Sequence, residues 1–395
     1  MQNKQLVFFR NYQVTLFTLF FIMLVWDVVF PSNLFVLILG LFSIVPVLIL
    51  KKGSIVSKEI RSYFSLTLFF IFIVIIHNYR YMYTQNILFS NNVSNLFLSI
   101  QLLWVLPLIF RSGTVAFKRA LDITLFILAL VFIIQFIGFY LTGDYLDVLK
   151  FFKGNGDDSK YMAYNSMLEQ TGLNIIRPTS IFNEPGTYCS YSFILFSLSF
   201  LNHKKVKKIH LFVLVTYLMS LSAFGIAIAV ASFIFIFYFE LKKRITKKKG
   251  VGKLLIFSSP FILIFLNFVI KYYVLRFVND STGADGGLTL RFNSIQKYDQ
   301  NSFEDKLYGL SFGYDQIESF FIQDTSMFFS ITLYLGVFSI FIYLFFLLKF
   351  KFNLLILFFF ILIGSTKIDF FSLAFWFFIS IASTLYFDNM KNKTI

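Results

Sequence analysis

The sequence predicts an all-α polytopic membrane protein with about twelve transmembrane helices. Three observations support this fold class. Hydrophobic residues make up 58% of the 395 residues, and 59 residues are phenylalanine. The apolar residues gather in about a dozen runs, most of them near the roughly 17 to 25 residues that span a bilayer. Basic residues concentrate in alternate connections between the runs, as they do in polytopic membrane proteins.

The apolar runs divide the chain into five parts. An N-terminal scaffold of five spans covers residues 1–141, central helices cover 187–270, and C-terminal helices cover 327–395. Two large extracytoplasmic loops, 142–186 and 271–326, separate them, and we expect each to contain a short surface helix. We expect the spans at about 14–30, 34–50, 63–77, 93–110, 121–141, 187–201, 209–220, 222–240, 254–270, 327–348, 354–363 and 370–387.

The charge distribution predicts the orientation. With the N-terminus in the cytoplasm, 24 of the 35 basic residues fall on the cytoplasmic side, and 15 of the 20 acidic residues fall outside. The positive-inside rule therefore accounts for the net charge of +15, and nucleic-acid binding is excluded as its cause. We expect a multi-pass protein of the bacterial cytoplasmic (inner) membrane, surrounded by membrane lipid, with both termini cytoplasmic.

Several kinds of chemistry are disfavoured by residue type. The single cysteine, Cys189, excludes an internal disulfide, and its apolar surroundings predict simple packing. The outer loops contain no Asp-x-Asp, histidine cluster or cysteine pair, so we expect no metal site and no cofactor. The three histidines lie away from the outer loops, which argues against a Ser-His-Asp mechanism.

The stretch Arg177-Pro-Thr-Ser-Ile-Phe-Asn-Glu184-Pro185-Gly186-Thr-Tyr188 joins the first outer loop to an apolar run. Pro178 and Pro185 stiffen it, and Pro185-Gly186 predicts a tight turn before a helix that begins near Thr187. Arg177 and Glu184 are therefore held on a short strap at the membrane edge. The pair is either part of a functional site or a structural clasp.

Residues 209–240 predict a short hairpin. The basic connections on both sides place its two ends in the cytoplasm, yet equal halves would each reach only about 24 Å, which is less than the bilayer core. We expect the break at Ser220-Leu-Ser-Ala-Phe-Gly225. Either the hairpin stops in a water-filled cavity and forms a floor for the outer site, or the bilayer thins there.

The second outer loop supplies further polar residues. After the flexible joint Gly283 to Gly287, apolar residues recur at helical spacing and predict a membrane-surface helix with Arg291 and Tyr298. Gly309-Leu-Ser-Phe-Gly313-Tyr314-Asp315 then predicts a turn. It has neither the spacing nor the lysine of a phosphate-binding loop.

Three outer arginines, Arg177, Arg276 and Arg291, are candidate pyrophosphate ligands. The guanidinium fork matches phosphate oxygens, and each charge-assisted hydrogen bond contributes about 1.5 to 3 kcal/mol. The alternative is that they pair with acidic residues of the second loop, namely Asp280, Asp285, Glu304 or Asp305.

Carboxylates are the remaining candidates for a general base acting on a sugar hydroxyl. Glu184 is the first choice, with Asp315 and Asp324 in reserve. Beside these residues, we assign substrate contacts to Asn183, Tyr188, Tyr298 and Tyr314.

Four stretches together resemble a known family. Arg177-Pro-Thr-Ser-Ile-Phe-Asn-Glu184-Pro185 resembles the R-x-x-S/G-x-F-x-E-P stretch of the Wzy-type O-antigen and capsule repeat-unit polymerases. Three further stretches resemble the same family in their order and spacing. They run from Leu218 to Gly225, from Leu307 to Gly313 and from Asp324 to Phe338. Two departures stand out: Asp324 replaces a histidine of the ligase relatives, and Ala223 and Phe224 stand where relatives often carry a basic residue.

The resemblance implies a GT-C-like helical fold with large outer loops. It also implies a substrate, undecaprenyl-pyrophosphate-linked oligosaccharide, and a chain-length-regulating co-polymerase as partner. The growing chain would be transferred from its lipid pyrophosphate to the non-reducing end of an incoming unit. The rival functions are a lipid-oligosaccharide flippase or other transporter, an O-antigen ligase, and a non-catalytic scaffold. The nearly uncharged spans and the long outer loops favour the polymerase.

Overall fold

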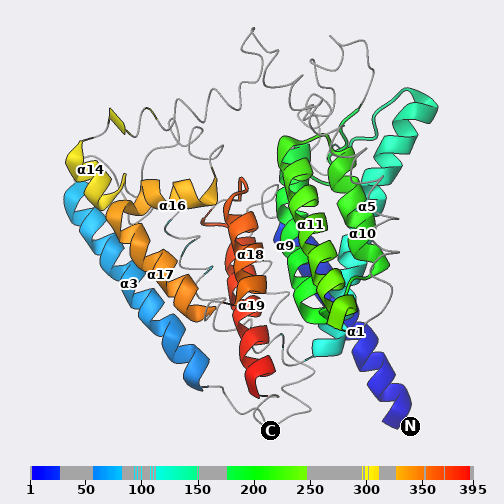
Figure 1. The fold of residues 1–395 in the computed structure, drawn as a ribbon, viewed down its shortest axis with the longest axis horizontal. Helices are drawn as coiled ribbons and strands as arrows, with labels where there is room; N and C mark the ends of the chain where they lie inside the picture. The colour runs from blue at the N-terminus through cyan, green and yellow to red at the C-terminus, as the bar shows by residue number, and fades with distance from the viewer. Residues whose placement is uncertain are drawn as a thin grey trace. The chain divides into compact units, whose positions relative to one another are not determined.

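The computed structural model describes residues 2–26, 57–81, 113–148, 150, 176–246, 302–310, 326–350, 353–368 and 370–391. Isolated residues are also described at 93, 96, 99, 107, 110, 296, 299 and 300. Within these ranges the fold is all-helical and contains no strand (Figure 1). The prediction of an all-α protein is confirmed for this part of the chain.

The helices in chain order are α1 (Gln2–Trp26), α3 (Ser57–Tyr81), α5 (Thr114–Thr142), α9 (Pro185–His203), α10 (Lys208–Met219), α11 (Ala223–Thr246), α14 (Phe303–Tyr308), α16 (Met327–Leu335), the 3-10 turn η3 (Gly336–Phe338), α17 (Ser339–Lys349), α18 (Leu354–Gly364) and α19 (Leu373–Lys391). Nine of the twelve predicted spans overlap these helices. The runs at 34–50 and 254–270 lie outside the described residues, and only isolated residues of 93–110 are described.

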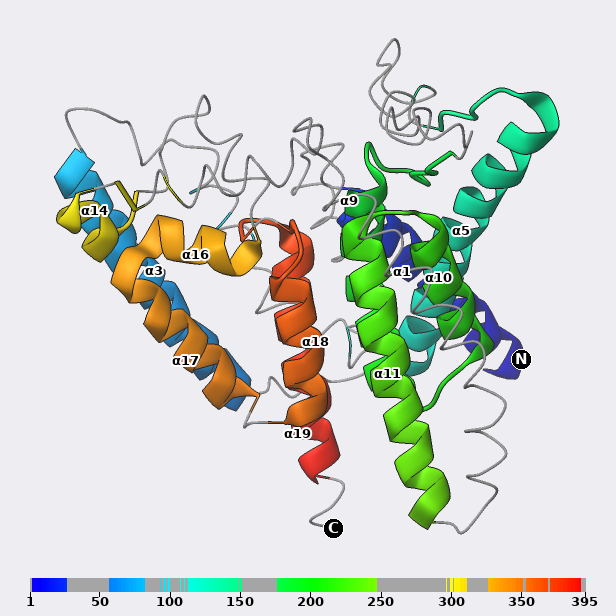
Figure 2. The same cartoon turned by 45° about the horizontal axis from the view of Figure 1, so that its top comes forward.

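Two helical stretches of the described chain are long and apolar enough to cross a membrane. They are Thr114–Thr142 and Met327–Lys349. The second was expected as one uninterrupted span, but it is broken at η3, where α16 and α17 take different directions (Figure 2). The reason is the backbone of Gly336, which has a φ of 54° and ends α16.

Polar side chains mark where several helices begin. The Ser302 hydroxyl accepts a hydrogen bond from the Asp305 N–H at the start of α14, and Ser326 does the same for Phe329 in α16. Asn353 caps α18 by accepting from two backbone N–H groups. These caps satisfy donors that have no partner within the helix.

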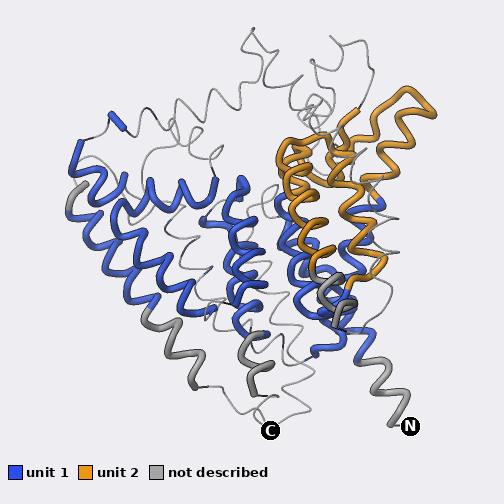
Figure 3. Tube along the Cα trace, viewed as in Figure 1, with its two compact units in different colours: residues 1–130, 190–205, 294–395 blue, residues 131–189, 206–293 orange. Residues whose placement is uncertain are grey.

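The described chain forms two compact units (Figure 3). Unit 1 comprises residues 1–130, 190–205 and 294–395, and unit 2 comprises residues 131–189 and 206–293. Helices α5 and α9 each contribute to both units. The units therefore do not follow the order of the predicted loops and span groups.

Phenylalanine rings fill the core of unit 1. The fully buried Phe21 ring meets Phe117 of α5 edge-on at 5.0 Å and Phe377 of α19 at 5.6 Å. Phe117 also meets Phe110 edge-on at 5.0 Å. Edge-to-face packing is favourable for aromatic rings, and with the tilted contact between Phe21 and Phe377 these contacts join α1, α5 and α19.

Two glycines bring a short helix against the break at η3 in unit 1. Gly309 follows α14 with a φ of 86°, and a Cβ there would overlap the Tyr334 carbonyl oxygen. A Cβ on Gly336 would lie 2.6 Å from the Gly309 nitrogen, and the Leu310 N–H donates to the Leu333 carbonyl. The stretches from Leu307 and from Asp324, which are distant in sequence, therefore meet backbone to backbone.

Helices α10 and α11 form a hairpin in unit 2 and lie side by side in Figures 1 and 2. The break falls at residues 220–222, as predicted. The two arms are unequal, as the predicted spans 209–220 and 222–240 also are: α10 has 12 residues and α11 has 24. At 1.5 Å per residue, α10 is only about 18 Å long.

The close backbone contact between Gly309 and Gly336 predicts that a methyl group added at either glycine destabilises the protein. Gly309→Ala and Gly336→Ala should each destabilise the protein by about 3 kcal/mol, because both meet backbone atoms and have a positive φ. The melting temperature in detergent measures the effect. Gly138→Ala is the matched control, since a Cβ there meets nothing within 4 Å, and it should not lower the melting temperature. Unchanged melting of the Gly309 variant would contradict the contact.

Candidate functional site

The strap, residues 176–184, is an extended and turned segment that leads into α9. Side chains of neighbouring segments hold its backbone. The Tyr145 hydroxyl accepts from the Thr179 N–H at 3.2 Å and bonds to Thr179 Oγ1 at 2.9 Å. Within the strap, the Phe182 N–H donates to the Thr179 carbonyl at 3.1 Å. The prediction of a stiff strap therefore has a physical basis in these bonds.

Ser180 has an unusual backbone conformation in the middle of the strap. Its φ is 58°, in the left-handed region that side-chain-bearing residues rarely adopt. Gln135 of α5 accepts from the Ser180 N–H at 2.7 Å and donates to the Ser180 carbonyl at 2.8 Å. Both residues are buried in unit 2, so the side-chain amide fixes the strap at this point.

The helix after the strap begins two residues earlier than expected. Pro185 is the first residue of α9, where the prediction placed a tight turn and a start near Thr187. Proline suits the first helical position because its φ is already helical and its missing N–H is not needed there. The Tyr188 N–H donates to the Glu184 carbonyl, so Glu184 stands directly at the helix start.

Arg177 and Glu184 reach the same turn from opposite ends of the strap. Arg177 Nε donates to the Ser220 carbonyl at 3.4 Å, at the α10–α11 break. A Cβ built on Gly186 would lie 3.3 Å from Glu184 Oε1 and 3.4 Å from Ser222 Oγ, so both oxygens border Gly186. The predicted break at Ser220 to Gly225 thus contacts the strap in unit 2.

Asn183, next to Glu184, holds a buried polar atom. Its Oδ1 is shielded from solvent and has no hydrogen-bond partner within the described residues. A buried carbonyl oxygen without a donor is costly, at about 1 to 3 kcal/mol. A ligand that supplied an O–H or N–H group there would recover that cost.

Tyr188 is a core residue rather than a substrate contact. Its side chain is fully buried, stacks on Phe132 at 5.1 Å and meets Tyr217 edge-on at 5.8 Å. Its hydroxyl bonds to Thr216 Oγ1 at 2.6 Å. Because Thr216 donates its own proton to the Val213 carbonyl, Tyr188 is the donor. The expected substrate role is wrong for this structure, since no surface of the ring is exposed.

Close packing fixes the hairpin against α9. Cys189 is fully buried and its thiol donates to Ser220 Oγ at 3.3 Å, which agrees with the predicted packing role. A Cβ on Gly225 would lie 2.6 Å from Cys189 Sγ and 2.8 Å from the Tyr217 carbonyl oxygen. Glycine therefore allows α11 to approach both α9 and α10 closely.

Six predicted site residues lie outside the described part of the chain. They are the arginines Arg276 and Arg291, the carboxylates Asp315 and Asp324, and the tyrosines Tyr298 and Tyr314. The predicted surface helices of both outer loops fall there too, apart from isolated residues. The site that the structure describes therefore consists of strap and hairpin residues alone.

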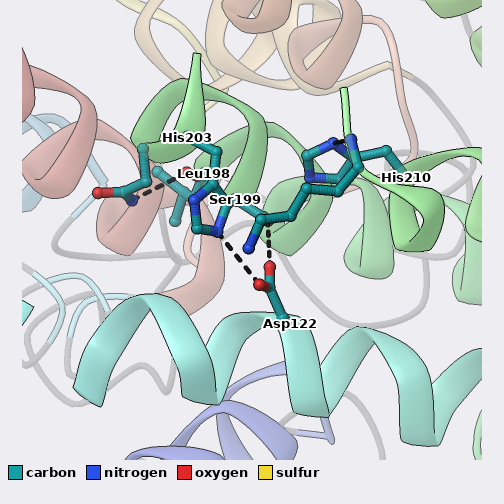
Figure 4. A network of polar contacts seen from close by, with 7 residues as sticks. Asp122, Leu198, Ser199, His203 and His210 are labelled. Carbon is teal, nitrogen blue, oxygen red and sulfur yellow. Dashed lines mark hydrogen bonds and ion pairs between the residues drawn. The ribbon is translucent and has the colours of Figure 1, made fainter. Parts of the chain in front are cut away.

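A second polar cluster lies in unit 1, where Asp122 of α5 bridges two residues of α9 (Figure 4). Asp122 Oδ1 accepts from Ser199 Oγ at 2.7 Å, and Oδ2 lies 3.1 Å from His203 Nε2. In a Ser-His-Asp triad the serine would donate to the histidine. Here both residues bind the carboxylate, so the cluster ties α5 to α9.

Comparison with protein-family models, curated proteins and solved structures finds no match. The chemistry of the site therefore has to be argued from its own residues. No group of three or more potential metal ligands occurs among the described His, Cys, Asp and Glu residues. The described site offers one guanidinium, one carboxylate, an amide and two serines.

Sequence reasoning missed the residues that support the strap. Gln135 was not singled out, although a lone polar residue in the apolar run from Leu130 to Phe139 is itself a signal of function. Tyr145 and Thr216 carried no such signal, because a tyrosine in a loop and a threonine in an apolar helix are common. Their roles depend on contacts that only folding creates.

The position of Tyr188 leads to a stability prediction. Tyr188→Phe should lower the free energy of unfolding by about 1 kcal/mol, since it loses one hydrogen bond but keeps the ring contacts. Tyr188→Ala should cost about 3 to 5 kcal/mol because it leaves a cavity. Thermal melting in detergent distinguishes the two. Equal melting of Tyr188→Ala and the wild type would show that the ring is not part of the core.

Proposed function

We propose that the protein is a polysaccharide polymerase that joins oligosaccharide repeat units carried on undecaprenyl pyrophosphate. The product would be an O-antigen or capsular polysaccharide, made at the outer face of the bacterial cytoplasmic membrane. One observation carries the proposal: Arg177 and Glu184 stand on a clamped strap and converge on the turn at Ser220 to Ser222. The proposal includes about twelve spans and a GT-C-like arrangement.

Exposed apolar stripes support a location in the membrane. On α5, Phe126, Leu130, Ile134, Ile137 and Leu141 recur at three- and four-residue steps, and each is at least 39% exposed. Helices α3 and α17 carry similar stripes. Contiguous apolar faces of this length are unfavourable in water and suit contact with lipid chains.

The proposed reaction needs a general base and a cationic group that stabilises the leaving group. Glu184 would accept the proton of an acceptor sugar hydroxyl, whose oxygen forms a new bond to the anomeric carbon of the growing chain. The bond from that carbon to the pyrophosphate oxygen breaks, and undecaprenyl pyrophosphate leaves with both bonding electrons. Arg177 would stabilise the negative charge that develops on this group.

The remaining predicted residues belong to the same proposal. Arg276 and Arg291 would complete the pyrophosphate site, Asp315 and Asp324 are the reserve bases, and Tyr298 and Tyr314 would contact sugar. Asn183 Oδ1, which has no hydrogen-bond partner among the described residues, supports a substrate hydrogen bond beside Glu184. No metal or other cofactor takes part in this mechanism. A co-polymerase that regulates chain length is the proposed protein partner.

The direct test is polymerisation by the reconstituted protein. The probe is the undecaprenyl-pyrophosphate-linked oligosaccharide extracted from the source bacterium after deletion of this gene. A ladder of products on a gel, unchanged by a chelator, is the expected result. A single band would overturn the polymerase proposal and favour a flippase or scaffold. A ladder abolished by chelation would overturn the metal-free mechanism.

Substitutions at the strap test the assigned roles. Glu184→Gln should lower the polymerisation rate by about a hundredfold or more, because it removes the base. Arg177→Lys should lower it by about tenfold, since the charge stays but the bidentate fork is lost. Asp144→Asn and Lys150→Gln are the controls, as both residues are exposed in the same unit. Full activity of Glu184→Gln would contradict its role as base.

The orientation can be tested with single cysteines. Because Cys189 is the only cysteine, Cys189→Ser gives a background without thiols. Asp144→Cys should react with an impermeant maleimide on intact spheroplasts, whereas Lys205→Cys should react only after lysis. Both positions are exposed in the fold. Labelling of both from the same side would contradict the proposed topology.

A further inference from the structure

We infer that Gln135 is a positioning residue, which sets the geometry of Arg177 and Glu184 by holding Ser180 in its left-handed conformation. The inference rests on the proposed function only for its kinetic consequences. Its structural part concerns the strap alone and can be tested without substrate. All residues involved lie in unit 2.

Every hydrogen-bonding atom of the Gln135 amide is used. Oε1 accepts from the Ser180 N–H at 2.7 Å, and Nε2 donates to the carbonyls of Ser180 at 2.8 Å and of Leu146 at 3.0 Å. The pattern allows only one orientation of the amide. A flipped amide would place its oxygen against two carbonyl oxygens and its NH2 group against an N–H donor.

The two hydrogen bonds between Gln135 and Ser180, here called the clamp, act on the residue with the unusual backbone conformation. For residues with a Cβ, the left-handed region persists only where the surroundings enforce it. Gln135 binds both the N–H and the C=O of Ser180, so rotation of this residue out of its φ of 58° would break two hydrogen bonds at once. The amide and the serine are both buried, which leaves no water to replace these bonds.

Ser180 lies between the two charged residues of the strap. Arg177 is three residues before it and Glu184 is four residues after it. The two side chains reach the turn at Ser220 to Ser222 only if the chain reverses correctly between them. A change of φ at Ser180 would move one end of the strap relative to the other, because a single backbone torsion redirects everything after it.

The first experiment replaces the amide by an apolar side chain of similar length. Gln135→Met should raise hydrogen exchange of the strap peptide, residues 176–184, by about tenfold, since the buried Ser180 N–H loses its acceptor. It should lower kcat by about tenfold or more with KM within about threefold, because the reacting groups are misplaced rather than removed. Thr124→Val, a buried polar substitution on the same helix, is the control and should change neither quantity.

Rescue by glycine separates positioning from a direct catalytic role. Glycine adopts a positive φ without strain, so Ser180→Gly should restore much of the kcat lost in Gln135→Met. A residue that contacted the substrate could not be rescued in this way. If the double variant is as slow as Gln135→Met, the inference is overturned.

A second pair of variants keeps the test valid should Gln135→Met fail to fold. In the wild-type background, Ser180→Gly should keep its activity, whereas Ser180→Val should lose about tenfold or more, because a β-branched residue resists a positive φ. Equal activities of the two would overturn the inference. If the wild type makes no polymer, the proposed function fails, but the structural part of the inference can still be tested. Hydrogen exchange of residues 176–184 should then be faster in Gln135→Met and in Ser180→Val than in Ser180→Gly. Equal exchange in these variants would overturn the inference.

Discussion

The site depends on hydrogen bonds between the strap and side chains outside it. A helix satisfies its own backbone, but residues 176–184 are neither helical nor paired in a sheet. Tyr145 and Gln135 provide the missing partners at Thr179 and Ser180, and both strap residues are buried. Without these partners, the strap would have to unfold into water or leave polar groups unsatisfied. Arg177 and Glu184 would then no longer both reach the turn at Ser220 to Ser222.

Each compact unit joins two of the four sequence stretches on which the proposed family resemblance rests. In unit 2, the strap meets the break between α10 and α11 through the bond from Arg177 to Ser220. In unit 1, the turn at Gly309 meets the break at Gly336 backbone to backbone. In both cases a helix is interrupted where an irregular segment docks, and a glycine or a left-handed residue permits the contact. These four stretches thus coincide with the places where regular structure ends.

The sequence predicted the positions of the helices better than the details of the candidate site. Helix positions followed from apolar runs, because backbone groups in an apolar environment are satisfied within a helix. The break near Ser220 followed from the basic flanks and the short run between them. The interruption at Gly336 and the early start of α9 at Pro185 did not, since contacts and local φ values decide such boundaries.

By itself, the sequence determined the helical class and the positions of most described helices, and it singled out the stretch from Arg177 to Glu184 as a candidate site. These properties follow from local composition, spacing and charge. Only the tertiary structure decided that Gln135 holds Ser180, that Tyr188 is fully buried, and that Arg177 and Glu184 share one turn. Such relations join residues distant in sequence, and their energies depend on burial and hydrogen-bond geometry, which a linear pattern does not contain.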